Sequence, residues 1–470
     1  MHRDDFRILL IFPPGKNVAS FSPDFNLLGE DYGHFPPLGL LYLASSLRAR
    51  GFGNIKVVDT SLRHLTVEQV GGVVEEFRPH LVGITAFTVG FGETVKIATT
   101  VKRIDPQIHV CVGGPHVKVF PRLTIEKPTI DSIVLGEGED VLADLADALV
   151  ADAPLPPGVI TLGNYPGDEA LPVQRITDLD RLPFPARDLM GGIVHSSSVG
   201  IMPKSLSIIT SRGCPFSCTF CDVPFKKVHY RSIGNVMDEI ESCRPDRDTE
   251  IFFYDETLNI VAERFTELCR ETARFRRPWS FRARMDLLDD NLLREAKQSG
   301  CFQLHFGLET TNDEGLAYLR KGITMEQARR AIAATKRAGI RIILNLMIVL
   351  PFEKTEADIQ RMMGEVIALD PYMVQINVFE PIPGTAIFED GVRKGILSWR
   401  DWEEYVRDPH DDFVPKTWDE HIEQAQVGRI WQNAYRTFYM RPGKILRYIF
   451  SVRTFSEFLR MFRNARQLLK

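Results

Sequence analysis

The sequence predicts an α/β protein: a doubly wound, Rossmann-like parallel sheet, then a partial (β/α)6 barrel of the TIM type, then C-terminal helices. Short apolar runs alternate with segments of helical spacing, and a stretch rich in proline and glycine interrupts that alternation once. Helices between strands favour parallel pairing, because each helix returns the chain to the same edge of the sheet. The predicted domains are 1–150, a linker at 151–200, the barrel at 201–385 and a helical region at 386–470.

Five predicted strands build the N-terminal sheet. The apolar run "RILLIF" ends at Pro13-Pro14-Gly15, and a long loop rich in Gly, Pro and Asp follows. The first helix, "LGLLYLASSLRAR", has a basic last turn and stops at Gly51. Each strand ends in Gly, Pro, Thr or Asp, which suits a ligand that lies across the carboxyl ends. The strands are expected at 7–12, 55–60, 81–87, 108–114 and 132–139.

Six strand–helix units follow the linker and predict about three quarters of an eightfold barrel. In such barrels the chemistry takes place at the carboxyl ends of the strands. The strands are expected at 205–211, 250–256, 279–286, 301–310, 341–351 and 373–381, with helices near 261–275, 290–299, 325–338 and 356–369.

Composition excludes several classes of protein. The chain is 44% hydrophobic and 25% charged, and its net charge of −5 gives no indication of a nucleic-acid partner. The longest apolar run, "GIRIILNLMIVLPF", is too short to span a bilayer and contains Arg341 and Asn345. The N-terminus reads as a strand and a loop, not as a signal peptide. Seven cysteines without a secretion signal favour reduced thiols and a cytoplasmic location.

Three of the cysteines are clustered in "TSRGCPFSCTFCDVP", which follows the first predicted barrel strand. Cys214, Cys218 and Cys221 have the spacing C-x3-C-x2-C. Structural zinc usually takes four ligands, often as two C-x2-C pairs, and iron–sulfur clusters also usually take four. His229 is a conceivable fourth ligand, eight residues further on, so structural zinc and idle thiols remain alternatives.

A C-x3-C-x2-C loop after the first strand of a barrel resembles the radical SAM superfamily. In that family three thiolates hold a [4Fe-4S] cluster, and the open iron binds the amino and carboxylate groups of S-adenosylmethionine (SAM). The resemblance implies that one electron from the cluster cleaves a carbon–sulfur bond of SAM and makes a 5′-deoxyadenosyl radical. The missing fourth ligand is then the place of SAM itself.

Further matches to this family imply which residues bind SAM. Phe220 fills the aromatic position that approaches the adenine, and Asp255 ends the second barrel strand. Arg284, in the third strand, would lie near the methionyl carboxylate. Gly307 permits close approach, and Glu309 would accept hydrogen bonds from the amino or ribose groups. Each of these residues also has a structural alternative. Phe220 could be a loop aromatic that packs on the barrel, Asp255 a solvated carboxylate at a strand end, and Arg284 an exposed strand arginine. For Glu309 function is favoured, because an unpaired carboxylate at a barrel rim is costly.

One stretch departs from the family pattern, which is rich in glycine around the fifth strand. "NLMIVLPFEKT" keeps Pro351 and Thr355 but has Asn345, Val349 and Glu353 at or near glycine positions. Side chains there are expected to narrow the pocket. Asn345 is retained as a SAM-binding candidate.

A doubly wound sheet before such a barrel resembles the cobalamin-binding radical SAM family, and the resemblance covers about residues 5–390. It implies that the carboxyl edge of the first sheet binds cobalamin, with glycines that let the corrin and its nucleotide tail approach the backbone. The alternatives are a sheet without a cofactor, or another nucleotide. The implied cobalamin-binding residues are Pro13, Thr85, Thr88, Gly113, Gly114, Gly136 and Glu137.

The chain lacks D-x-H-x-x-G, the motif that supplies an axial histidine in other cobalamin proteins. His34 and His116 lie in suitable loops, but neither has the neighbours of that motif. Cobalamin is therefore expected to bind without a histidine ligand.

The resemblance implies an enzyme that methylates an unactivated carbon, using a 5′-deoxyadenosyl radical and methylcobalamin, with SAM as the source of both. A second possibility is an oxidative cyclase or another radical tailoring enzyme with the same cofactors. A non-enzymatic alternative is an iron–sulfur electron carrier, which three cysteines oppose. A methylthiolating enzyme of tRNA would want more N-terminal cysteines and a basic RNA-binding domain.

Partners follow from the same resemblance and from the tail. The substrate is expected to be a small molecule, such as a lipid, a porphyrin or a natural-product intermediate, and the electron donor a flavodoxin or ferredoxin. Residues 435–470 hold nine Lys and Arg against one acid, Glu457, with Phe450, Phe455, Phe458 and Phe462 at helical spacing. The tail is either a basic amphipathic helix on the inner face of a membrane or a helix packed on the barrel.

Overall fold

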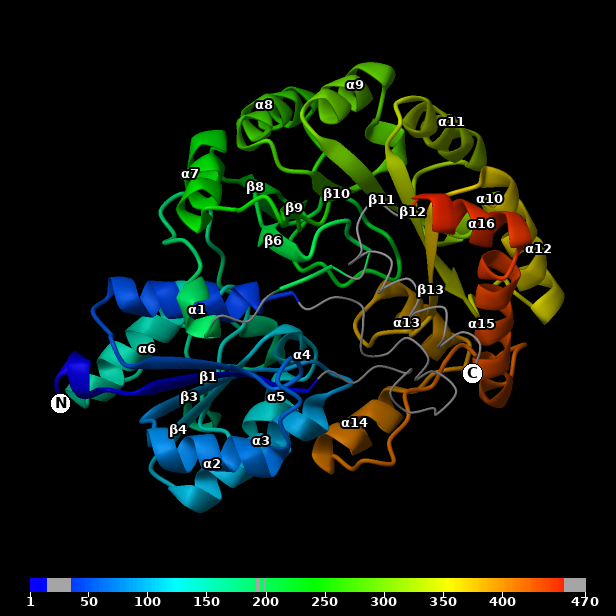
Figure 1. Ribbon diagram of the computed structural model, residues 1–470. Helices are drawn as coiled ribbons and strands as arrows, with labels where there is room; N and C mark the ends of the chain where they lie inside the picture. Colours follow the sequence, from blue (N-terminus) through cyan, green and yellow to red (C-terminus); the bar gives the residue numbers. More distant parts are fainter. Residues whose placement is uncertain (15–34, 192–194, 198, 452–470) are drawn as a thin grey trace. The chain divides into compact units, whose positions relative to one another are not determined.

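The computed structural model describes residues 1–14, 35–191, 195–197 and 199–451 (Figure 1). These residues fall into two compact units. The first contains 1–14, 36–191 and 398–414, and the second contains 35, 195–197, 199–397 and 415–451. Residue His34 and the tail aromatics Phe455, Phe458 and Phe462 lie outside the described residues.

A five-stranded parallel sheet forms the centre of the first unit, with the strand order β2-β1-β3-β4-β5. This is a doubly wound order, in which the direction of winding changes between β1 and β3. Helix α1 packs against α6, and α2 packs against α3. The strands are β1 (Ile8–Phe12), β2 (Ile55–Asp59), β3 (Leu81–Thr85), β4 (His109–Gly113) and β5 (Ser132–Ile133). The helices are α1 (Leu38–Ala49), α2 (Val67–Phe77), α3 (Phe91–Ile104), α4 (Pro115–Val119), α5 (Pro121–Ile125), α6 (Glu139–Ala151) and α14 (Trp399–Arg407).

Helix α14 comes from far along the chain but belongs to this first unit. The Tyr405 hydroxyl accepts a hydrogen bond from Gly92 N at 3.0 Å and donates one to Val89 O at 3.1 Å. The Trp399 ring meets Phe120 edge-on at 5.7 Å. Between α6 and the second unit the chain has short 3-10 turns at Leu162–Asn164, Asp168–Ala170 and Arg187–Met190.

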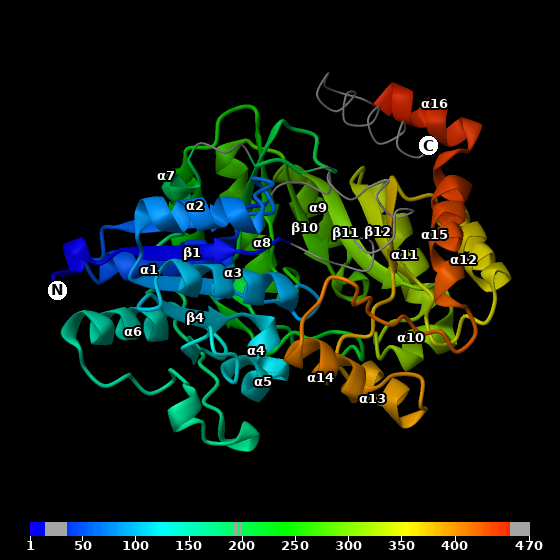
Figure 2. The same cartoon turned by 90° about the horizontal axis from the view of Figure 1, so that it is seen from below.

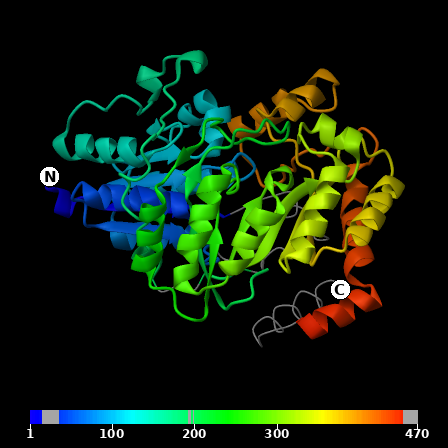
Figure 3. The ribbon, with the colours of Figure 1, turned by 90° about the horizontal axis from the view of Figure 1, so that it is seen from above.

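Six parallel strands form the sheet of the second unit, in the sequential order β6-β9-β10-β11-β12-β13. This is the order of a partial barrel, and its helices line one side of the strands (Figure 3). The strands are β6 (Lys204–Ile208), β9 (Thr249–Phe253), β10 (Trp279–Ala283), β11 (Cys301–Glu309), β12 (Arg341–Ile348) and β13 (Met373–Val378), and a small hairpin pairs β7 (Ser211–Arg212) with β8 (His229–Tyr230). The helices are α7 (Ile233–Cys243), α8 (Ala262–Thr272), α9 (Asp290–Gln298), α10 (Asp313–Tyr318), α11 (Met325–Arg337), α12 (Glu356–Leu369), α13 (Ala386–Arg393), α15 (Gln424–Tyr439) and α16 (Pro442–Ser451).

Helix α15 covers the free edge of β13 and lies beside α12 (Figure 2). The Tyr435 hydroxyl accepts from Ile376 N and the Tyr439 hydroxyl from Val374 N, both at 3.0 Å. Trp431 Nε1 donates to Ile376 O at 2.7 Å. These side chains satisfy backbone groups that an edge strand would otherwise leave unpaired. The predicted α/β class, with a doubly wound sheet, a partial barrel and C-terminal helices, is confirmed.

Candidate functional site

The cysteine loop leaves the barrel at the carboxyl end of β6, where the sequence places it. Gly213 opens the loop with φ +99°, and a side chain there would come within 2.6 Å of Lys227 O. Only glycine combines that conformation with so close an approach. Cys214 N then donates to Phe225 O at 3.0 Å, which closes the base of the loop.

Backbone hydrogen bonds hold the middle of the loop against two other elements. Thr219 N donates to Leu319 O at 3.0 Å, just after α10. Ile387 N, in the first turn of α13, donates to Thr219 O at 3.0 Å. Within the loop Cys221 N donates to Cys218 O at 3.2 Å. The thiol positions are therefore fixed by backbone contacts that do not depend on the thiols themselves.

The three thiols are free and half-buried. Burial raises the pKa of the Cys221 thiol, and the charges of Cys218, Glu256 and Cys214 raise it further. A bound cation would therefore favour the ionised form of the Cys221 thiol. Among the described residues no group of three or more His, Cys, Asp or Glu side chains is close enough to hold a single metal ion, His229 included. An iron–sulfur cluster is larger than one ion and spreads its thiolate ligands, so the donor set fits a three-thiolate cluster better than zinc.

Asp255 lies beneath the entrance to this loop and is 2% exposed. Its carboxylate accepts hydrogen bonds from Thr210 N and Thr210 Oγ1, each at 2.7 Å, and from Ser211 Oγ at 2.6 Å. Burial raises the pKa of Asp255, against the effect of these hydrogen bonds. The contacts give Asp255 a role in fixing the exit of β6, and its predicted contact with SAM stays a prediction.

Glu309 forms an ion pair that the sequence analysis did not anticipate. Lys321 Nζ lies 2.8 Å from Glu309 Oε1 and 5.7 Å from the centre of the Phe220 ring. Glu309 has φ +69°, rare for a residue with a side chain. A Cβ at Gly307 would come within 2.5 Å of Glu309 Oε1 and 2.9 Å of Lys321 Nζ. The predicted residues Phe220, Gly307 and Glu309 thus converge around Lys321.

Arg284 joins the same cluster from the end of β10. Its guanidinium stacks on the Phe216 ring at 3.6 Å and donates to Lys321 O at 2.8 Å. It also pairs with Asp286 at 2.9 Å. In the cysteine loop, Phe216 therefore lies against Arg284 and Phe220 lies near Lys321. The hydrogen bond from Arg284 to the Lys321 carbonyl joins the two cations. The only sequence signal for Lys321 is its place before Gly322, which has φ +70°.

The stretch "NLMIVLPFEKT", which departs from the glycine-rich family pattern, buries the side chains of Val349 and Glu353. Val349 has φ +64°, an outlier for a β-branched residue. The Glu353 carboxylate is 5% exposed and accepts a hydrogen bond from Leu350 N at 2.9 Å. Burial raises the pKa of Glu353 to about 8. Asn345 is half-buried, and its side-chain Nδ2 donates a hydrogen bond to Phe306 O at 3.2 Å. One N–H group of the Asn345 amide is therefore already bonded to the neighbouring strand β11.

The carboxyl edge of the first unit brings several of the predicted cobalamin residues together. Thr85 and Gly113 end adjacent strands and are paired in register, and Pro13 follows β1 on the other side of β3. Phe87 is 39% exposed and meets the Phe12 ring at 5.5 Å. An exposed aromatic and small residues where the winding direction changes fit a large planar ligand.

The other two glycines of this edge, Gly114 and Gly136, are required by close contacts within the first unit itself. A Cβ at Gly114, which has φ +94°, would come within 2.7 Å of Thr85 Oγ1. A Cβ at Gly136 would collide with the backbone of Gln174. Glu137 N donates to Gln174 O at 3.0 Å, and the Glu137 carboxylate accepts from Ile176 N. Gly136 and Glu137 are therefore engaged by the chain itself, and a role in cobalamin binding stays a prediction for them.

His116 is enclosed by its own unit. It is 0% exposed, its ring stacks on Phe91 at 3.9 Å, and its Nδ1 lies 3.4 Å from Thr88 Oγ1. Burial lowers its pKa to about 3. A ring in this position is not available to an axial ligand site, and cobalamin bound without a histidine ligand stays a prediction.

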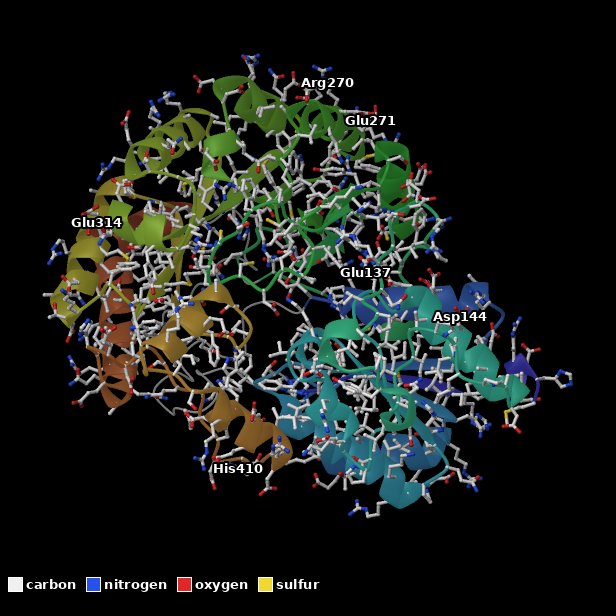
Figure 4. The ribbon with its side chains drawn as sticks, turned by 180° about the vertical axis from the view of Figure 1, so that it is seen from behind. Glu137, Asp144, Arg270, Glu271, Glu314 and His410 are labelled. Carbon is white, nitrogen blue, oxygen red and sulfur yellow. The ribbon has the colours of Figure 1, made fainter. Side chains whose placement is uncertain are left out.

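The depressions found on the outer surface of the barrel unit lie away from these sites. One, of about 400 Å³, is lined by side chains of α8 that include Arg270 and Glu271, both on the outer surface in Figure 4. Another, of about 530 Å³, lies near Arg244 and Arg274. Charged side chains are common in both linings, but none of them belongs to the cluster around Lys321.

Comparison with known proteins matches both units. Residues 27–146 match the B12 binding domain, and residues 208–366 match the radical SAM superfamily. The chain is 28% identical over 460 residues to an uncharacterised methyltransferase of Pyrococcus horikoshii, covering 94% of this chain and 95% of that protein.

Two further similarities extend this finding. The chain is 28% identical over 393 residues to the anaerobic magnesium-protoporphyrin IX monomethyl ester cyclase of Rubrivivax gelatinosus, covering 79% of this chain and 69% of that protein. The solved structure of the radical SAM methyltransferase TsrM from Kitasatospora setae, with cobalamin and a [4Fe-4S] cluster bound, superposes with a TM-score of 0.68 and 19% identity, over 93% of this chain and 90% of that one. That likeness is one of fold.

Proposed function

We propose that this chain, which belongs to the cobalamin-binding radical SAM family, transfers a methyl group to an unactivated carbon of a small-molecule substrate. The observation that carries the proposal is the cysteine loop, which offers three free thiols close to the Glu309–Lys321 pair. Among the described residues, no histidine or carboxylate joins these thiols as a further ligand to a metal ion. Similarity to a methyltransferase along nearly the whole length supports the same reaction.

When bound, the [4Fe-4S] cluster supplies the electron that cleaves SAM, and cobalamin supplies a carrier for the methyl group. Cys214, Cys218 and Cys221 would hold the cluster. Glu309 would accept a hydrogen bond from the SAM amino or ribose group, since Lys321 occupies only its Oε1. Phe220 would lie against the adenine. The Lys321 ammonium fixes the direction of the Glu309 carboxylate and so orients what binds it.

A second candidate reaction keeps both cofactors and forms a ring. Its support is the similarity to the magnesium-protoporphyrin IX monomethyl ester cyclase. The two reactions differ in products, because methylation consumes SAM as a methyl donor and releases S-adenosylhomocysteine as well as 5′-deoxyadenosine.

The experiment is anaerobic loading of the full chain with iron, sulfide and hydroxocobalamin, followed by absorbance spectroscopy and analysis of SAM products. The proposal expects both chromophores on one chain, and both S-adenosylhomocysteine and 5′-deoxyadenosine after reduction. 5′-Deoxyadenosine without S-adenosylhomocysteine would favour the cyclase. Absence of cobalamin binding would contradict both reactions. We expect a flavodoxin or ferredoxin to supply the electron in the cell.

We further propose peripheral contact of the C-terminal tail with an anionic membrane. No helix within the described residues is long and apolar enough to cross a bilayer. On α16, Ile445 and Leu446 are exposed to 39% and 55%, whereas Lys444 is buried and donates to Pro371 O at 2.6 Å. Each basic residue near an anionic surface contributes about 1 kcal/mol, and salt weakens the effect.

Vesicle sedimentation tests this contact. Full-length protein should sediment with anionic vesicles at low salt, and a truncation of 452–470 should not. That truncation leaves Tyr435 and Tyr439 on β13. Equal sedimentation with neutral and anionic vesicles would contradict the membrane contact, and aggregation of the truncated protein would favour packing on the barrel.

A further inference from the structure

The barrel sheet has an inner face, opposite the side on which the barrel helices pack. In β10, Phe281 and Ala283 belong to the apolar core beneath the helices, whereas Arg282 lies between them in sequence. Side chains alternate across a strand, so Arg282 points to the face opposite the helices. In β11 the same alternation puts Gln303 and His305 on that inner face.

Arg282 lies among aromatic rings on this face. Its guanidinium carbon lies 4.2 Å from the centre of the Tyr254 ring and 6.0 Å from that of Phe252. The Phe35 ring lies 5.5 Å from each of those rings. A guanidinium that stacks by its flat face keeps its N–H groups free at its edge, where a carboxylate can be bound by two hydrogen bonds.

No carboxylate pairs with Arg282 within the part of the chain that the structure describes. The charges of Glu256 and Arg282 interact, but the two side chains are too far apart to form an ion pair. Glu256 is solvent-accessible, yet the protein atoms around it desolvate its carboxylate and so raise its pKa. His305 is neutral, because burial and the Arg282 charge lower its pKa to about 3. Gln303 Nε2 lies 3.1 Å from His305 Nε2, and the buried Gln303 Oε1 has no hydrogen-bond partner among the described residues. On this face, the Arg282 guanidinium therefore lies on the same side of the sheet as two neutral polar side chains, Gln303 and His305.

We propose that this inner face binds the reacting substrate by a carboxylate group, with Arg282 as the anchoring cation. Phe35, Phe252 and Tyr254 take the planar or apolar part of the molecule that carries the carboxylate. A single cation with Glu256 in its surroundings favours a monoanion over a phosphate dianion. The inference rests on the proposed function, because it names the substrate class of the same enzyme.

The test uses three probes that share one ring system: 2-naphthoate, 2-naphthamide and 2-naphthyl phosphate. Their binding to the cofactor-loaded full chain is measured by calorimetry. Naphthoate should bind roughly tenfold tighter than naphthamide, and naphthyl phosphate no tighter than naphthoate. In Arg282→Gln the preference for naphthoate over naphthamide should disappear, while the iron and cobalt contents match those of the unchanged chain.

Arg341→Gln is the matched control. Arg341 is also a half-buried strand arginine, stacked on Tyr372 at 4.2 Å, but it lies at the amino end of β12. It should retain the preference for naphthoate. No binding of naphthoate, equal binding of the amide, tighter binding of the phosphate, or an unchanged preference in Arg282→Gln would each overturn the carboxylate site. A preference for naphthoate in a chain that takes up no cobalamin would support the site and contradict the proposed function.

Discussion

Gly307 in the barrel and Gly136 in the first unit stand at the carboxyl edges of two parallel sheets, yet different neighbours require them. A side chain at Gly307 would meet Glu309 Oε1 and Lys321 Nζ, both charged side-chain atoms. A side chain at Gly136 would meet the backbone of Gln174. Gly307 therefore leaves room for the charged side chains of Glu309 and Lys321, whereas Gly136 leaves room for the backbone of Gln174 to pass close by. The same residue type at equivalent positions therefore does not carry the same functional meaning.

Among the substitutions that distinguish the two glycines, Gly136→Ala is expected to have the largest effect. The substitution combines φ +86° with a backbone collision, so we expect it to lower the free energy of unfolding by roughly 3 kcal/mol or more. Gly113→Ala is the control, since its Cβ would lie 3.6 Å from Val134 O, an ordinary contact, and should change stability by less than about 1 kcal/mol. Urea unfolding measures both. Equal effects would show that Gly136 is not held by the Gln174 crossing.

Glu309→Gln tests whether the charged pair beside Gly307 takes part in binding SAM. It keeps the shape but removes a charged acceptor, worth about 1.5–3 kcal/mol, so SAM affinity should fall roughly ten- to a hundredfold. Lys321→Met should lower SAM affinity less, because it only frees the carboxylate to turn. Glu314→Gln, at an exposed residue of α10 (Figure 4), should have no effect. Equilibrium dialysis with SAM decides, and unaltered affinity in Glu309→Gln would assign Glu309 a purely structural role.

Each unit buries one histidine whose pKa is lowered to about 3, His116 in the first and His305 in the second. Each takes up a proton only on unfolding, so its contribution to stability is present above pH 6.5 and is lost as the pH falls below it. Between pH 7 and pH 5 each should account for about 2 kcal/mol of lost stability. Denaturant unfolding of His116→Phe and His305→Phe at both pH values should show a smaller loss, each in its own unit. An unchanged pH dependence would mean that the ring is charged or solvated in the fold.

Sequence periodicity predicted the positions of the longer strands, because a strand buried on both faces is a short apolar run that turn residues end. The segment predicted as a strand at 132–139 is one only at Ser132–Ile133, and α6 begins at Glu139. The cysteine spacing located the site for a similar reason, since all three donors lie on one local loop. Lys321 was missed because its partner Glu309 is twelve residues away, across α10, and no local pattern joins them. The place of α14 in the first unit depends on contacts such as Tyr405 with Gly92, which are more than three hundred residues apart.

Asp255 and Glu137 show the other limit of sequence reasoning. Both are acids at strand ends, where a ligand contact is a reasonable prediction. In the fold Asp255 accepts from Thr210 and Ser211, and Glu137 accepts from Ile176. Which groups satisfy a carboxylate depends on the path of segments that follow it in space, and that path is not encoded in its neighbours in the sequence.

One chain should hold a three-thiolate cluster in its barrel unit and cobalamin in its first unit, and metal analysis measures both cofactors in a single experiment. After anaerobic loading and desalting, the unchanged chain should retain about four iron atoms and one cobalt atom. With Cys214, Cys218 and Cys221 all replaced by Ala, the iron should be lost while the cobalt stays. Retained iron in that variant, or no cobalt in the unchanged chain, would contradict the account.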